Sequence, residues 1–171
     1  ITGEKLLSIA ADLTTFVDGR KLEDDASVLL RMTNNIKGNL SISQIATCEE
    51  NNFKISIYGD KGALHWSQEN PNYAMFNKLG QANQIVSRGG FIQYDGSLSS
   101  TRVPPGHPEG YLEAFAQIYS DAADVIMNKP NKLELLDILP NVKDGLHIMK
   151  FINACVDSSN SNSNWTNLST E

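Results

Sequence analysis

Hydrophobic and polar residues alternate along the first two thirds of the chain, in short runs separated by polar turns. A period of two residues places every second side chain on the same face, which is typical of a half-buried β-strand. The segments NNIKG (34–38) and GDKG (59–62) predict hairpin turns between neighbouring strands. Strands are predicted at residues 5–13, 26–33, 39–48, 53–58 and 63–68, with weaker ones at 73–79 and 83–88.

The period changes to that of a helix after Pro108. Apolar residues then recur every three or four positions, which indicates an amphipathic helix that ends near Lys129. Pro108 suits the first helical position, and the carboxylates of Glu109 and Glu113 favour the positive end of the helix dipole. The predicted apolar stripe consists of Tyr111, Leu112, Phe115, Ile118, Tyr119, Ala122, Val125 and Ile126.

A second helix is predicted to begin after Asn141. The Asn141 side chain can cap the first turn, and Asp144 can reach back from the third helical position. Residues 158–171 are rich in Ser and Asn, which predicts a loosely held C-terminal tail. The apolar stripe of this helix would be Val142, Leu146, Met149, Ile152 and Val156.

Strands in one run followed by helices in another indicate an α+β fold rather than alternating βαβ units. We expect one domain over residues 1–171, an open, mostly antiparallel sheet with both helices packed on one face. The opposite face can meet water or pack against another sheet, and the pattern leaves both possibilities open. That face would carry Ser41, Ser43, Thr47, Ser56, Tyr58, His65 and Ser67.

Composition and charge exclude several classes of function. The 171 residues carry a formal net charge of −6 with a pI near 5.0, which argues against binding to nucleic acid or to an anionic membrane. No apolar run approaches the roughly 18 residues of a membrane span, and no signal peptide opens the chain, so we expect a cytoplasmic protein. Cys48 and Cys155 lie far apart in apolar surroundings and are expected to be reduced, buried thiols.

The sequence contains no complete catalytic or cofactor motif. No G-x-G-x-x-G follows a strand, and no G-x-S-x-G, H-E-x-x-H or metal-spaced cluster occurs. The segment PPGHPEGY (104–111) holds His107 among prolines and glycines, either as an incidental part of a helix entry or as a polar group presented to a hydroxylated ligand. The segment RKLEDD (20–25) carries Arg20 and Lys21, either as a solvated connection or as donors to a sugar-like ligand.

Four segments in this order form a more specific pattern: DDASVLLRMTNNIKGNLSISQIA, FKISIYGDKGALHWSQENPN, GHPEGYLEAFAQIYSDAADVI and PNVKDGLHIMKFINACVDSS. The pattern resembles the C-terminal part of the glucose-fructose oxidoreductase / inositol dehydrogenase (Gfo/Idh/MocA) family. The resemblance covers about residues 5 to 159. IYGDKGALHW followed by GHPEGYLEAFA carries most of its specificity.

The resemblance implies a two-domain enzyme that transfers a hydride to or from sugars, inositols or related polyols. An N-terminal Rossmann domain binds NAD or NADP in this family, and its catalytic lysine and histidine precede the segment matched here. We therefore expect no catalytic residue, cofactor site or metal site in this chain, and no catalysis by the chain alone. The chain starts without Met in a strand-like pattern, ITGEKLLSI, and we expect it to be part of a longer protein.

The resemblance also assigns roles to particular residues. In similar proteins the GHPEGY segment lies beside the substrate cleft, which implies that His107 contacts a substrate hydroxyl, with Arg20 and Lys21 as further candidates. The open sheet face commonly packs against a second subunit. This implies a homo-oligomer interface that contains Ser41, Ser43, Ser56, Tyr58, His65 and Ser67. The alternative is a stand-alone structural or interaction module without catalysis.

Overall fold

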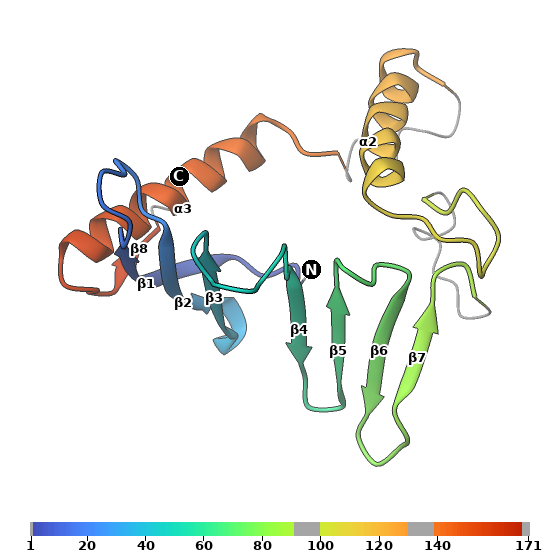
Figure 1. The fold of residues 1–171 in the computed structure, drawn as a ribbon, viewed down its shortest axis with the longest axis horizontal. Helices are drawn as coiled ribbons and strands as arrows, with labels where there is room; N and C mark the ends of the chain where they lie inside the picture. The colour runs from blue at the N-terminus through green and yellow to red at the C-terminus, as the bar shows by residue number, and fades with distance from the viewer. Residues whose placement is uncertain (1, 91–99, 130–138, 169–171) are drawn as a thin grey trace. The chain divides into compact units, whose positions relative to one another are not determined.

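The computed structural model describes residues 2–90, 100–129 and 139–168, which divide into two compact units (Figure 1). One unit comprises Ile1–Cys48 with Pro140–Glu171, and the other comprises Glu49–Leu139, a finer division than the single domain that the sequence predicts. Among the described residues each unit holds a four-stranded antiparallel sheet and one α-helix. The α+β class is confirmed, with two sheets where the sequence predicts one.

The sheet of the first unit has the strand order β3-β2-β1-β8. Its strands are β1 (Leu6–Thr14), β2 (Asp25–Met32), β3 (Lys37–Ser43) and the short β8 (Thr166–Asn167). The predicted hairpin at NNIKG joins β2 to β3 through a 3-10 turn, Thr33–Asn35. Asn34 and Asn35 adopt φ values of 54° and 59°, a left-handed conformation that asparagine tolerates better than most residues.

The helix of the first unit, α3 (Val142–Asn160), packs against β1 (Figure 1). β8 pairs only with Ser8 and Ile9, so the edge of β1 beyond them needs other partners for its backbone N–H groups. Ser158 Oγ accepts a hydrogen bond from Ala11 N (2.9 Å), and Ser159 Oγ accepts one from Leu13 N (3.0 Å). Leaving such a buried donor unpaired costs about 1–3 kcal/mol, so the two serines fix where the helix meets the strand.

The face of α3 that packs against the sheet differs from the predicted one. Ala154, Cys155 and Ser158 are buried, with Phe151 partly buried beside them. Their small side chains let the helix approach β1 closely, so the sheet selects them over the larger apolar residues on the neighbouring face. The predicted stripe of Val142, Leu146, Met149, Ile152 and Val156 is exposed.

Residues 158–168 are held in the structure, although their composition predicts a loose tail. Ser158 Oγ also donates to Asn164 O (2.7 Å), and Thr166 and Asn167 extend the sheet as β8. Leu168 is buried and joins Ile9 and Val28 in the core of this unit. Residues 169–171, the rest of the predicted tail, lie outside the described residues.

The sheet of the second unit has the order β4-β5-β6-β7. It consists of β4 (Lys54–Tyr58), β5 (Gly62–Ser67), β6 (Tyr73–Lys78) and β7 (Gln84–Ser87), followed along the chain by α2 (Tyr111–Ile126). The predicted GDKG hairpin is confirmed, since Tyr58 pairs with Ala63 across it. A Cβ at Gly62 would lie 2.5 Å from Asn77 O, so only glycine lets β5 approach β6 this closely.

The second unit buries less apolar surface than the first unit. Among its described residues Glu109 is the one buried side chain, and the hydrophobic residues all keep some exposure. The predicted stripe of α2 is largely exposed, with Tyr111, Leu112, Phe115 and Ile126 among its accessible residues. An antiparallel sheet commonly packs one face against a core, and the described residues of this unit show little packing of that kind.

The cysteines follow the predicted pattern only in part. Both are free thiols, but Cys155 is buried in the core of the first unit whereas Cys48 is exposed and has a φ of 70°. Burial raises the pKa of the Cys155 thiol, which keeps it in the neutral form. In the part of the chain that the structure describes, no helix has the length and apolar character needed to cross a membrane.

Candidate functional site

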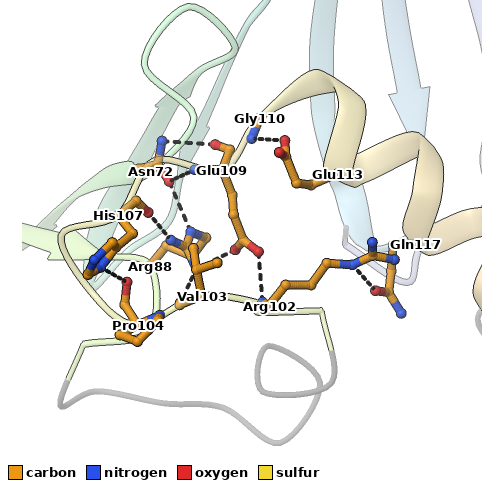
Figure 2. A network of polar contacts seen from close by, with 10 residues as sticks. All are labelled: Asn72, Arg88, Arg102, Val103, Pro104, His107, Glu109, Gly110, Glu113 and Gln117. Carbon is orange, nitrogen blue, oxygen red and sulfur yellow. Dashed lines mark hydrogen bonds and ion pairs between the residues drawn. The ribbon is translucent and has the colours of Figure 1, made fainter.

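A network of polar contacts joins three segments of the second unit (Figure 2). Asn72 lies just before β6, Arg88 follows the last residue of β7, and the loop from Arg102 to Gly110 leads into α2. These segments are far apart in sequence, and their polar groups meet around the Arg88 guanidinium. This cluster contains the PPGHPEGY segment that the sequence singles out.

Arg88 contacts the loop at several points. Its Nη1 donates to Val103 O (3.2 Å) and its Nη2 donates to His107 O (2.6 Å), while Nε donates to Asn72 Oδ1 (2.9 Å). The guanidinium also forms an ion pair with the Glu109 carboxylate. A planar guanidinium can serve acceptors in several directions at once, and Arg88 uses this geometry to hold both ends of the turn.

Glu109 is the buried partner of this arginine, with only 6% of its side chain exposed. One carboxylate oxygen faces Arg88 and the other accepts a hydrogen bond from Arg102 N (2.8 Å). The backbone of Glu109 is fixed as well, because its N–H donates to Asn72 Oδ1 (3.0 Å) and its carbonyl accepts from Asn72 Nδ2 (2.9 Å). A buried charge must be paired in this way, so the loop has little freedom to move away from β7.

Helix α2 begins three residues later than the sequence predicts. Its first residue is Tyr111 and its N-cap is Gly110, so Pro108 lies in the preceding loop and Glu109 serves the buried ion pair instead of the helix dipole. Glu113 closes the first turn by accepting a hydrogen bond from Gly110 N (2.8 Å), which lowers the pKa of Glu113 below its usual range. The predicted cap of α3 is confirmed, with Asn141 and Asp144 bonded as expected.

His107 sits at the exposed tip of the loop. Its backbone N–H donates to Pro104 O (3.2 Å), and Gly106 between them has a φ of 84°, a conformation that favours glycine. The ring is exposed, and its Nδ1 lies 3.3 Å from Pro104 O. The prolines and glycines thus build a tight turn that presents the imidazole on its outer surface, as Figure 2 shows.

Arg20 and Lys21 belong to the other unit, on the exposed loop between β1 and β2. This loop is ordered by Asp24, a buried carboxylate that accepts hydrogen bonds from Phe16 N (2.8 Å) and Val17 N (3.0 Å). Arg20 Nη1 lies 3.3 Å from the same carboxylate and forms an ion pair with it. Lys21 follows Arg20 on the loop. The hydrogen bond from Phe16 does most to lower the pKa of Asp24, burial opposes it, and Val17 and Arg20 add smaller contributions to the lowering.

The residues predicted for an oligomer interface fall on two sheets. Ser56 and His65 are directly opposite each other, with His65 Nδ1 3.0 Å from Ser56 Oγ, and Tyr58 packs edge-on against the His65 ring. Ser67 lies on the same face, opposite Lys54. Ser41 and Ser43 belong to β3 in the other unit.

The described residues offer polar side chains for hydrogen bonding, with an exposed imidazole at His107. They contain no group of three His, Cys, Asp or Glu side chains that could hold a metal ion. The two carboxylates of the cluster are engaged, Glu109 with Arg88 and Glu113 with the first turn of α2. An exposed imidazole on a rigid turn can exchange hydrogen bonds with a hydroxyl, and this is the chemistry that the loop supports.

Sequence reasoning missed Asn72, Arg88 and Arg102, and it assigned Glu109 to a different role. The contacts of Asn72 with Glu109 span 37 residues, so no local pattern reports them. The available signal is weak. A glutamate between Pro108 and Gly110, two residues before the helix begins, is free to turn inward, and an arginine at the end of a strand can meet it. Neither feature identifies the partner without the fold.

The chain is similar to known oxidoreductases along nearly all of its length. Residues 8–168 match the model of an oxidoreductase family, C-terminal alpha/beta domain. An uncharacterized oxidoreductase, YfiI, from Bacillus subtilis (strain 168) is 30% identical over 165 residues, which are 94% of this chain and 42% of that protein.

Solved structures agree with this match. An oxidoreductase from Sinorhizobium meliloti superposes with a TM-score of 0.89 at 41% identity, covering 95% of this chain and 46% of that one. An inositol dehydrogenase homolog from Azotobacter vinelandii, complexed with NADH and myo-inositol, gives a TM-score of 0.87 at 26% identity, with coverages of 96% and 45%. The chain therefore spans less than half the length of each of these relatives.

The Asp24 contacts predict a pH-dependent stability of the loop that carries Arg20 and Lys21. The pKa of Asp24 is lower in the folded chain than its unfolded value of about 3.9, so the carboxylate contributes stability above that pH, and the contribution is lost as pH falls through the folded pKa. Asp24→Asn should therefore be less stable than the wild type at about pH 7, with the deficit shrinking as pH falls below about 4.

Urea unfolding of both proteins between about pH 3 and pH 7 measures this difference. Asp18→Asn, an exposed aspartate on the same loop, is the matched control. A deficit of Asp24→Asn that stays constant over the whole range would contradict the assignment.

Proposed function

Because this chain belongs to the oxidoreductase family whose C-terminal alpha/beta domain it matches, we propose a function for it within such an enzyme. We propose that the chain is the substrate-binding and oligomerisation domain of an NAD(P)-dependent enzyme. The substrate class is a sugar or polyol, and the reaction is hydride transfer at a carbinol or carbonyl carbon. The observation that carries the proposal is the His107 turn, an exposed imidazole on a loop fixed by a buried ion pair. The Azotobacter vinelandii homolog, complexed with a nicotinamide cofactor and a polyol, supports the choice of substrate class.

The cofactor is proposed to bind a separate Rossmann domain that precedes this chain. When bound, it supplies the hydride acceptor or donor. The N-termini of the two described α-helices are poorly suited to its pyrophosphate, because the Glu113 carboxylate occupies that of α2, and Asn141 and Asp144 occupy that of α3. The role left for this chain is to bind and orient the substrate, and we propose that it is inactive without the cofactor domain.

The alternative is a stand-alone interaction module that kept the sheets and lost the chemistry. The two proposals differ in the encoding gene, because a dehydrogenase requires an upstream glycine-rich phosphate loop in the same reading frame. The similarity to longer oxidoreductases, of which this chain spans less than half, favours the dehydrogenase. The exposed, tightly held His107 also favours it, since a purely structural loop has no need to present an imidazole.

The proposed contact of His107 with substrate predicts a selective kinetic effect. In the full-length enzyme His107→Ala should lower kcat/KM for the polyol about tenfold or more, because a hydrogen bond to a substrate hydroxyl is lost, while the Kd of NAD(P) stays unchanged. Steady-state kinetics with myo-inositol and a panel of sugars, together with cofactor titrations, measure both. His147→Ala, an exposed histidine on α3, is the matched control. Unchanged substrate kinetics in His107→Ala would leave the histidine as part of the helix entry alone.

A second proposal concerns assembly. The β4–β7 sheet has accessible residues on the face that carries Ser56, Tyr58, His65 and Ser67, and the Tyr58 side chain is 76% exposed. We propose that this face packs against a second copy of the chain. Ser41 and Ser43 on β3 belong to the other unit, and we propose them separately as contacts with another copy. Uncharged hydroxyl side chains beside an exposed aromatic suit a surface that loses its water on association.

Tyr58→Lys should weaken this association, because it adds a second positive charge to a face that already carries Lys54 and has no described carboxylate. Light scattering over a concentration series should show the wild type as a dimer or larger and Tyr58→Lys shifted towards the monomer. Tyr119→Lys, an exposed tyrosine on α2, is the control and should leave the mass unchanged. A wild-type monomer at high concentration would refute the assembly.

A further inference from the structure

Resting on the proposed function, we infer that Arg88 is a positioning residue for His107 and that it sets which nitrogen of the imidazole faces the substrate. Arg88 does not reach the outer surface of the turn, because its side chain is 82% buried by the cluster around it (18% exposed). It acts through the backbone, by holding the carbonyl oxygens of Val103 and His107. Those two carbonyls bracket the turn that carries the histidine.

The second step concerns the imidazole itself. Nδ1 of His107 lies 3.3 Å from Pro104 O, and a carbonyl oxygen can only accept a hydrogen bond. The contact therefore requires a proton on Nδ1, which in the neutral ring makes Nε2 an acceptor. An acceptor at Nε2 suits a ligand that donates, and each hydroxyl of a polyol is such a donor. The position of Pro104 O thus selects the tautomer that can accept a hydrogen bond from the substrate.

The third step links this geometry to Arg88. Pro104 lies between Val103 and His107, the two residues whose carbonyls Arg88 holds, so the guanidinium fixes the turn on both sides of the Pro104 carbonyl. Glu109 and Asn72 in turn hold the guanidinium in place. Lysine cannot replace this arrangement, since its ammonium is a compact point charge and cannot span both carbonyls and Asn72 with fixed geometry. Displacing a binding group by about 1 Å can cost up to a hundredfold in rate.

The direct test is the tautomer of His107 in the 171-residue chain, read from imidazole nitrogen chemical shifts. The His107 signals are assigned by their loss in His107→Ala. The wild type should show the Nδ1–H form at a pH where the ring is neutral, and Arg88→Lys should shift the ring towards a mixture of the two forms. Arg102→Lys is the control, because Arg102 lies on the same loop but its guanidinium bonds to Gln117 and Ser120. An unchanged His107 ring in Arg88→Lys overturns the inference.

The kinetic consequence is tested in the full-length enzyme. Arg88→Lys should raise KM for the polyol about tenfold with the Kd of NAD(P) unchanged, and it should have no further effect on kcat/KM in a His107→Ala background. Additive effects of the two substitutions would overturn the inference, because they would show that Arg88 acts on the substrate independently of His107. If Arg88→Lys fails to fold, Glu109→Gln takes its place; it keeps the side-chain shape, removes the ion pair, and should change the ring and KM in the same direction.

The two proposals can fail separately. An unaffected kcat/KM in His107→Ala removes the substrate contact from the proposed function, while the tautomer measurement still decides whether Arg88 positions the ring. A kinetic effect of His107→Ala with an unchanged ring in Arg88→Lys supports the substrate contact and overturns the positioning role.

Discussion

In each of the two units, a polar group that is shielded from water needs a hydrogen-bond or ion-pair partner, and this need fixes the position of a loop or helix. In the second unit the group is the Arg88 guanidinium, which gathers Asn72, the 102–110 loop and Glu109 around itself. In the first unit it is the edge of β1, whose free N–H groups are taken by the hydroxyls of Ser158 and Ser159. In both cases the cost of leaving the group unpaired exceeds what a surface contact contributes, so these few bonds decide where loops and helices lie.

This requirement explains how an irregular loop can hold an exposed side chain in a fixed position. Hydride-transfer chemistry needs a substrate held in one orientation, and orientation needs groups that do not move with the solvent. The 102–110 loop has no regular secondary structure among its described residues, and the Arg88–Glu109 pair gives it a fixed position that such a loop would otherwise lack. In the proposed function, the exposed His107 is a recognition group on this rigid support, and the catalytic groups lie in the cofactor domain.

Local sequence patterns were sufficient for most of the regular structure. Period-two alternation located β1 to β7, and the GDKG and NNIKG turns gave the correct hairpins, because strand faces and turn residues are set by neighbours in sequence. The cap of α3 followed from Asn141 and Asp144 for the same reason. The buried face of α3 could not be predicted from its hydrophobicity, because the small residues Ala154 and Cys155 pack against β1 while a more hydrophobic stripe is exposed. The polar composition of residues 158–168 likewise predicts a loose tail, but pairing of Thr166 and Asn167 with β1 holds this segment in place.

The candidate site was predictable only at its surface. Proline and glycine spacing pointed to a fixed turn at His107, and the resemblance supplied a role for it. The support beneath the turn depends on contacts among Asn72, Arg88 and Glu109 that are distant in sequence, so it became visible only with the fold.

The central claim is that this fixed turn presents His107 to a polyol substrate. The crystal structure of the full-length enzyme with NAD(P) and myo-inositol tests it most directly. The account predicts His107 Nε2 at a hydrogen-bonding distance of about 2.7–3.2 Å from a substrate hydroxyl, with Nδ1 still on Pro104 O. A polyol bound in the cofactor cleft with the His107 ring turned away from it would contradict the account.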